Sequence, residues 1–416
     1  MEHGAFGPGW LGSTQRLFAL ARALQAHDWR TTLLGSRRSL VKRHRLIERA
    51  FPGVFVRTPF PSGAWPRALD YPYVRSLWIQ AQPRGTRCLV DDPEFQWAPR
   101  MEKWAQARAE REGEPDVIWG ISYGSLRSAV AARHACERLD VPLVVEFQDP
   151  CPYPGEELDL LEARALERTL QYASAVITTT STYASELSDR FPKAANKIHV
   201  IHLTMPPKPP QARIQSAAGD PPGDATLTLL HPGTLYGGGA RNARSLVRAL
   251  PLLFERRPEA EDRVRLRLVG GGPGLAEAAA EAKKLSVAEA VSVEDPVPPE
   301  MIWQQMVSAD CLVVIKHPGG AYNAQIPGKV FCFLAAERPI LALVPEGETA
   351  TIVRGSGLGL IAPPDDAPTI ADRLVDLWDA KVSGRSTVAP VRSYISRFSE
   401  ENMGDQLRQL LDTVRR

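Results

Sequence analysis

The chain has 416 residues, of which 24% are charged and 44% are hydrophobic, as in an ordinary globular protein. Its 50 basic and 48 acidic residues leave a net charge of +2, which favours no nucleic-acid partner. It contains no apolar run of about 18 residues that could span a membrane, and its opening residues do not predict a signal peptide. Its five cysteines are scattered and odd in number, so we expect a reduced, cytoplasmic protein without a disulfide framework.

The first half of the chain alternates apolar runs of strand length with segments of helical period. This alternation is typical of βαβ units around a parallel sheet. We expect strands at 31–34, 117–120, 143–147, 175–179 and 198–202. We expect helices at 14–26, 125–139, 156–172 and 181–191. The opening residues 1–9 already have loop composition, so the first strand of this domain is expected to be replaced or lost upstream.

The second half restarts the same alternation after a stretch rich in proline and glycine, which cannot form a helix or an inner strand. We expect strands at 227–231, 265–269, 290–293, 311–315 and 340–344, and helices that include 275–285 and 329–336. The predicted organisation is a domain at 1–204, a linker at 205–224, a domain at 225–385 and a helical segment at 386–416 that returns to the first domain. Two doubly wound domains place a ligand at the carboxyl ends of their strands, in the cleft between them.

Lys329 begins one of the predicted helices, directly after a polar loop that contains Pro327. A helix N-terminus carries the positive end of the helix dipole, and the lysine adds a full charge there. The segment therefore predicts an anion-binding site.

A second candidate for anion binding follows the strand at 227–231. Gly233, Thr234 and Tyr236 form part of a glycine-rich turn, and Arg241 and Arg244 lie in the first turns of the helix that we expect next. Glycine allows close approach of the backbone, and a guanidinium group can hold a diphosphate through two hydrogen bonds. Alone, such a turn followed by solvated arginines is more often an ordinary surface feature.

A third glycine-rich turn, Gly270, Gly271 and Gly272, follows the next strand. Glycine here would let a nucleotide base or ribose lie against the main chain, although such turns are common. In the first half, Gly12 precedes a predicted helix, with Ser13 or Thr14 as its N-cap, and Asp149 follows a predicted strand. A carboxylate at a strand end could bind hydroxyl groups, but an Asp-Pro pair more often forms a turn.

These motifs resemble those of the GT-B glycosyltransferases, in particular the retaining family that builds bacterial polysaccharides. Members carry Pro-x-Lys-x-x-Glu/Asp-Tyr-Leu-Ala followed by Arg/Lys-Pro-Ile/Val-Leu. The matching residues are Pro327, Lys329, Leu334, Ala335, Arg338, Pro339 and Leu341. The resemblance extends over nearly the whole chain and implies an α/β protein of two doubly wound Rossmann-like domains with a cleft between them.

The resemblance also implies roles for the candidate residues. Gly12, Gly233, Thr234, Tyr236, Arg241 and Lys329 would hold the donor phosphates, and Gly270, Gly271, Gly272 and Cys332 would contact the nucleotide. Asp149 matches an acid of the family and would be catalytic. The substrates would be a nucleoside-diphosphate sugar and a glycan or lipid-linked acceptor, with no cofactor and no metal, since arginine and lysine neutralise the leaving diphosphate.

The chain departs from the family pattern at several positions. Cys332 stands where an acid normally holds the ribose, so we expect either a weaker affinity for the donor or another acid, such as Glu346 or Glu348, in its place. The stretch from Gly120 to Tyr123 lacks a histidine that many members have. These departures leave two alternatives to a transferase: a catalytically weak or inactive GT-B accessory protein in a polysaccharide assembly complex, and a nucleotide-sugar epimerase.

A basic stretch with interspersed apolar residues occupies 36–51. It could seat the first domain on the anionic inner membrane surface, where lipid-linked acceptors lie. A solvated helix face explains the same pattern equally well.

Overall fold

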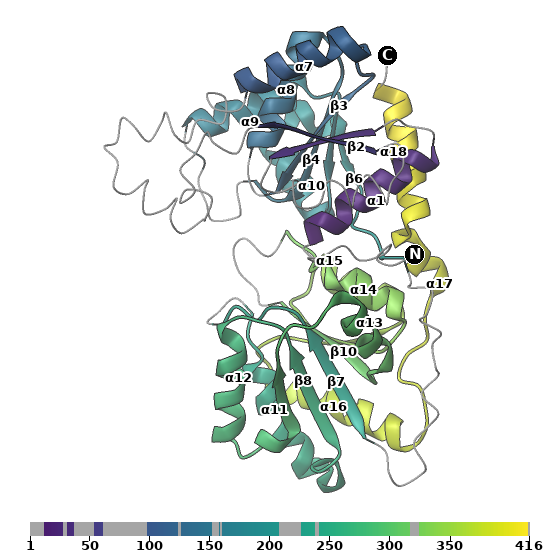
Figure 1. The fold of residues 1–416 in the computed structure, drawn as a ribbon. Coiled ribbons are helices and arrows are strands. Elements are labelled where there is room, and N and C mark those ends of the chain that lie inside the picture. Colours follow the sequence, from purple (N-terminus) through teal and green to yellow (C-terminus); the bar gives the residue numbers. More distant parts are fainter. Residues whose placement is uncertain are drawn as a thin grey trace, which may run out of the picture. The chain divides into compact units, whose positions relative to one another are not determined.

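The computed structural model describes residues 12–27, 31–36, 54–60, 98–123, 126–151, 158, 160–207, 226–237, 241–316 and 324–414 (Figure 1). The chain divides into two compact units. The first unit comprises Arg16–His202 and Met403–Arg416, and the second comprises Met1–Gln15 and Leu203–Asn402. The basic stretch at 37–51 and the glycine-rich opening at 1–11 lie outside the described residues.

The first unit contains a four-stranded parallel sheet with the strand order β3-β4-β5-β6. These strands are β3 (Ile118–Tyr123), β4 (Leu143–Asp149), β5 (Ala175–Thr178) and β6 (Ile198–Val200). A separate two-stranded parallel sheet consists of β1 (Thr31–Ser36) and β2 (Val54–Phe60). The helices are α1 (Gly12–Ala26), α7 (Ala98–Glu112), α8 (Arg127–Leu139), α9 (Leu160–Tyr172), α10 (Ser181–Arg190) and α18 (Glu400–Val414), with a 3₁₀ helix at Pro192–Lys197.

Helices α1 and α18 come from opposite ends of the chain and pack together against one face of this sheet (Figure 1). Leu20 of α1 and Leu407 of α18 share a buried apolar cluster with Val144 of β4 and Ile177 of β5. The last turns of the chain thus belong to the core of the first unit.

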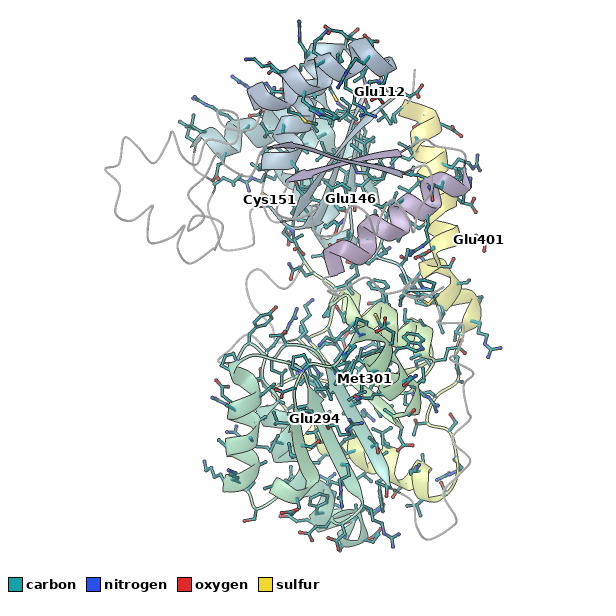
Figure 2. The ribbon with its side chains drawn as sticks, in the orientation of Figure 1. Glu112, Glu146, Cys151, Glu294, Met301 and Glu401 are labelled. Carbon is teal, nitrogen blue, oxygen red and sulfur yellow. The ribbon has the colours of Figure 1, made fainter. Side chains whose placement is uncertain are left out.

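A buried ion pair lies beside this cluster. Arg16 Nε donates to Glu146 Oε1 at 2.9 Å, and both side chains are inaccessible to solvent. Glu146 is labelled in Figure 2. Arg16 also donates to the carbonyl oxygens of Ile201 and His202, at 3.2 and 2.8 Å. One guanidinium group therefore ties α1 to β4 and to the segment that ends the unit.

The second unit contains a six-stranded parallel sheet with the order β12-β11-β10-β7-β8-β9. Its strands are β7 (Leu227–Pro232), β8 (Val264–Val269), β9 (Val291–Glu294), β10 (Cys311–Ile315), β11 (Ile340–Leu343) and β12 (Gly359–Ala362). Counted from β7, this is the doubly wound order 6-5-4-1-2-3, which reverses direction between β7 and β10. Ligands of such sheets bind at this switch point, outside the carboxyl ends of the strands.

Helices cover both faces of the six-stranded sheet. One face packs against α11 (Arg244–Arg256), α12 (Pro273–Lys284) and α16 (Ala367–Val382). The other packs against α13 (Pro299–Ser308), α14 (Lys329–Ala336), α15 (Glu348–Gly355) and α17 (Arg392–Ile395). Short 3₁₀ helices lie at Pro258–Ala260, Ala288–Ala290 and Ser396–Phe398. Because both faces are covered, the inner strands are apolar along their whole length, as the continuous burial of β10 shows.

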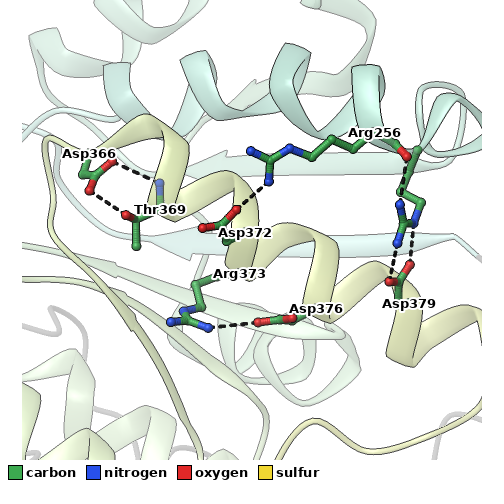
Figure 3. Close-up of polar contacts among 8 residues, drawn as sticks. Arg256, Asp366, Thr369, Asp372, Arg373, Asp376 and Asp379 are labelled. Carbon is green, nitrogen blue, oxygen red and sulfur yellow. Dashed lines mark hydrogen bonds and ion pairs between the residues drawn. The ribbon is translucent and has the colours of Figure 1, made fainter.

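Polar contacts link α16 to α11 at the surface of this layer (Figure 3). Asp366 caps α16 by accepting from the Thr369 N–H at 3.0 Å. Arg257, just after α11, holds Asp379 with two hydrogen bonds of 2.7 Å. Exposed pairs of this kind contribute about 0–1 kcal/mol, so the buried apolar cluster dominates this interface.

The predicted class, an α/β protein with two parallel-sheet domains, is confirmed. Most predicted elements are present within a few residues, and the helix at 329–336 has the predicted bounds. Strands β2 and β12 and helix α7 were not predicted from the sequence, and α9 begins at Leu160, four residues after the predicted start at 156. Within the described part of the chain, no helix is long and apolar enough to cross a membrane.

Candidate functional site

Three basic side chains lie at the switch point of the second unit. His231 lies near the carboxyl end of β7, and Lys316 directly follows β10. Lys329 is the first residue of α14, the helix that leads into β11. The doubly wound topology thus brings together residues that are up to 98 positions apart in the sequence.

Lys329 and His231 are in direct contact. The Nζ atom of Lys329 lies 3.3 Å from Nε2 of His231, whose Nδ1 lies 2.9 Å from the carbonyl oxygen of Val313. A carbonyl oxygen only accepts, so Nδ1 carries the proton and Nε2 is the acceptor for the lysine. The imidazole therefore bridges β7, β10 and the start of α14.

Gly233 also lies directly beside the ammonium group of Lys329. Its φ is +122°, and a Cβ placed on it would lie 2.7 Å from Nζ of Lys329. The ammonium group thus occupies space that any other residue at position 233 would fill. The positive φ favours glycine at this position, and the absence of a side chain leaves room for the lysine.

Positive charge is concentrated at this site. Burial and the neighbouring Arg241 lower the pKa of Lys329 to about 7. The same two causes lower the pKa of Lys316 to about 8, against an opposing effect of Glu348. Burial, Lys329 and Arg241 lower the pKa of His231 well below its ordinary value, so the imidazole is neutral. An anion bound here would relieve the repulsion among these cations.

The loop after β7 presents alternate side chains to solvent. Thr234 and Tyr236 are exposed, whereas Leu235 between them is fully buried. The guanidinium carbon of Arg241 lies 5.4 Å from the centre of the Tyr236 ring, and the Gly237 N–H donates to the Arg241 carbonyl at 3.0 Å. Arg241 precedes α11, which begins at Arg244, so the loop and not the helix sets its position.

The turn after β8 packs directly on this loop. A Cβ on Gly270 would lie 2.0 Å from the carbonyl oxygen of Gly233, and one on Gly272 would lie 2.3 Å from that of Leu235. The close approach of the two loops therefore accounts for both glycines. A Cβ on Gly271, in contrast, would meet no atom within 4 Å among the described residues, so this stretch of backbone offers an open surface to a ligand.

Cys332 lies in the first turn of α14, and the structure buries it. Its side chain belongs to an apolar cluster that includes Val330 and Phe331, and burial raises the pKa of its thiol to about 12. Of the two acids that could replace it, Glu346 is exposed and pairs with Arg354 at 2.8 Å. Glu348 begins α15 and acts electrostatically on Lys316, so it is the acid coupled to the cationic site.

Two candidate residues belong to other elements. Gly12 is the first residue of α1. Asp149 is the last residue of β4 and is partly buried. The roles predicted for Gly12 and Asp149 in the site therefore stay predictions.

Two residues of this site, His231 and Lys316, were not identified from the sequence. Each lies at or just beyond the carboxyl end of a predicted strand, and this position could have marked them as candidate ligand-binding residues. Their proximity depends on β7 lying next to β10, which periodicity alone does not reveal. Among the described residues, no group of three or more His, Cys, Asp or Glu side chains is arranged to hold a metal ion.

A doubly wound unit with a cationic switch point, joined to a second parallel α/β unit, defines a two-domain protein suited to a phosphorylated ligand. Residues 12–204 match the family model described as "Glycosyl transferase 4-like domain", and residues 226–380 match "Glycosyl transferases group 1". The chain therefore belongs to the glycosyltransferases that these two models describe. No curated protein sequence gives a significant match.

Solved structures with the same fold include several glycosyltransferases. A glycosyltransferase from Rickettsia africae is 12% identical with a TM-score of 0.66, over 98% of this chain and 96% of that one. HepE from Anabaena in complex with UDP is 15% identical with a TM-score of 0.64, over 98% and 97%. Sucrose-phosphate synthase from Thermosynechococcus elongatus is 16% identical with a TM-score of 0.57, over 95% and 92%. The predicted GT-B fold is confirmed.

Proposed function

We propose that this chain transfers a sugar from a nucleoside-diphosphate sugar to a glycan or lipid-linked acceptor, with retention of anomeric configuration and without a metal ion. The observation that carries the proposal is the set of cations at the switch point, where burial and the neighbouring Arg241 lower the pKa of both Lys329 and Lys316. A bound diphosphate would supply negative charge where these cations repel one another. The same cations would stabilise the diphosphate as it leaves, which is the role a metal has in other transferases.

The loops around the cations support a nucleotide donor. The open backbone at Gly271 and the exposed Tyr236 provide surfaces for the remainder of the ligand. Glu348 is the acid that we propose in place of the acid missing at Cys332, because it acts on Lys316 within the site. HepE of Anabaena, whose structure was solved with UDP, has the same fold.

The acceptor would be held by the first unit, with Asp149 at the end of β4 binding its hydroxyl groups. The basic and apolar stretch at 36–51 supports work at the inner membrane surface, in the cytoplasm, where lipid-linked acceptors lie.

The test is turnover of a panel of nucleoside-diphosphate sugars, with a bacterial lipid extract as the source of acceptor. Released nucleoside diphosphate and sugar-labelled product are quantified together by chromatography. We expect both with the parent protein and neither with Lys329→Met, while Lys283→Met, an exposed lysine on α12, serves as the matched control. Interconversion of the sugar without transfer would indicate an epimerase, and no turnover of any donor would indicate an accessory protein.

A further inference from the structure

We propose that His231 is a positioning residue for Lys329: its unprotonated Nε2 holds the lysine ammonium group against Gly233, facing the ligand. The inference rests on the proposed function only in taking that ligand to be a diphosphate. The contact itself belongs to the ligand-free protein.

The geometry gives the imidazole a fixed direction. Its Nδ1–H donates to the Val313 carbonyl at 2.9 Å, so the lone pair of Nε2 points toward Lys329 Nζ, 3.3 Å away. The side chain of His231 is fully buried, whereas Lys329 is partly exposed, so the imidazole is the fixed acceptor on the protein side of the ammonium group. The lowered pKa of the histidine keeps this lone pair available.

A lysine needs such a fixed partner in this site. Its ammonium group is a point charge on a flexible four-carbon stem, and the nearby Arg241 repels it. One hydrogen bond to His231 restrains the stem and leaves the remaining N–H groups of the ammonium for a ligand. The wall at Gly233 limits movement on the other side.

The competing explanation is that His231 only joins β7 to β10 through Val313. Substitutions separate these two roles. In His231→Asn the amide N–H₂ can replace Nδ1–H, but the side chain is too short to reach Lys329. In His231→Gln the longer amide can place an acceptor near the position of Nε2, and His231→Leu provides neither.

The first experiment measures Lys329 in the ligand-free protein. Competitive acetylation with acetic anhydride across a pH series, read by peptide mass spectrometry, gives the pKa and reactivity of this one lysine. The groups that act on it are His231, Arg241 and Cys332, with Lys316 and Glu348 beyond them. We expect a lower pKa in His231→Leu and His231→Asn, because the charged form loses its acceptor, and a value near the parent's in His231→Gln.

The second experiment measures binding of inorganic pyrophosphate by calorimetry, which requires no knowledge of the base. We expect His231→Leu and His231→Asn to weaken binding about tenfold, and His231→Gln to stay within about threefold of the parent. Leu229→Val weakens the core of the same strand without a polar contact to Lys329, and it reports what destabilisation alone does.

The outcomes are distinct. Unchanged Lys329 titration in all three variants, or parent-like behaviour of His231→Asn together with loss in His231→Gln, overturns the positioning role. If the parent fails to bind pyrophosphate, the proposed diphosphate site fails, and the acetylation profile still decides on His231. If His231→Leu does not fold, the Asn and Gln variants carry the comparison.

Discussion

A side chain at position 233 would displace the ammonium group of Lys329 from its place beside Gly233. A Cβ on Gly233 would lie 2.7 Å from Nζ of Lys329, and the backbone at this glycine has a φ of +122°. The loop after β7 and the start of α14 are therefore mutually constrained, although nearly a hundred residues separate them. Gly233 therefore belongs to the candidate site because it leaves room for Lys329.

We expect Gly233→Ala to weaken binding of nucleoside diphosphates at least tenfold, or about 1.4 kcal/mol, because the new methyl group displaces the lysine. Gly384→Ala is the matched control: its φ of +63° also lies in the left-handed region, and nothing lies within 4 Å of the added Cβ. Calorimetry on both variants gives the comparison. Equal affinities in the two would show that a methyl group at position 233 does not displace Lys329 from the ligand.

Donor binding should take up protons. The pKa of Lys329 is lowered to about 7 and that of Lys316 to about 8, whereas a bound anion favours the charged form of each. Affinity for a diphosphate should therefore fall as the pH rises above about 7, by up to tenfold per pH unit for each proton taken up.

Calorimetry in buffers of different ionisation enthalpy measures this uptake directly. Lys329→Arg keeps its charge across the range and should flatten the pH profile. Unfolding returns the pKa of Lys329 to the higher value of an exposed lysine. Between the folded and unfolded pKa the unfolded state binds more protons, so the free energy of unfolding should increase as the pH rises through this range. If the measured binding enthalpy did not depend on the buffer, no proton would be taken up, and the proposed protonation of Lys329 on diphosphate binding would be refuted.

Cys332→Glu should destabilise the second unit. The side chain lies in an apolar cluster and is 4% exposed, and a buried carboxylate without a partner costs several kcal/mol. Cys332→Ala, of similar size and without charge, is the control. Thermal unfolding decides: an unchanged melting temperature with tighter nucleotide binding would instead place position 332 beside the ribose.

The pair of Arg16 and Glu146 should contribute strongly to the first unit. Removing one partner, as in Glu146→Leu, leaves a buried charge and should cost about 3–5 kcal/mol, and replacing both should cost less than the sum. Chemical denaturation of the singles and the double measures this coupling. The exposed pair of Glu346 and Arg354, with side chains 76% and 55% exposed, serves as a control and should change stability by at most about 1 kcal/mol. If the effects of the two single substitutions simply added up in the double variant, Arg16 and Glu146 would not stabilise each other, and the prediction would be wrong.

The sequence predicted the fold well where local pattern decides it. Helix α14 lies between Pro327 on one side and Pro339 on the other, and the residues after Lys329 are apolar, so its ends were readable. Strand β12 was not predicted because Gly359–Ala362 is short, only partly buried and at the sheet edge. Lys329 was identifiable from its motif and its place at a helix start.

The rest of the site could not be predicted in this way. His231 and Lys316 gain their importance from the adjacency of β7 and β10, which lie 82 residues apart at the His231–Val313 contact. Gly270 and Gly272 were predicted to face a nucleotide, and the structure shows that contacts with the loop after β7 already require both. Long-range packing, not local pattern, settles these positions.

The most direct test of a diphosphate site compares UDP, GDP and ADP with their nucleosides in calorimetric titrations of the parent protein, Lys329→Met and Arg241→Ala. We predict that at least one diphosphate binds the parent at least tenfold more tightly than its nucleoside, because the cations at the switch point hold the diphosphate. We also predict that each substitution removes about 1.5–3 kcal/mol of that affinity, without changing the affinity for the nucleoside. Equal binding of nucleoside and diphosphate by the parent would contradict the proposed site.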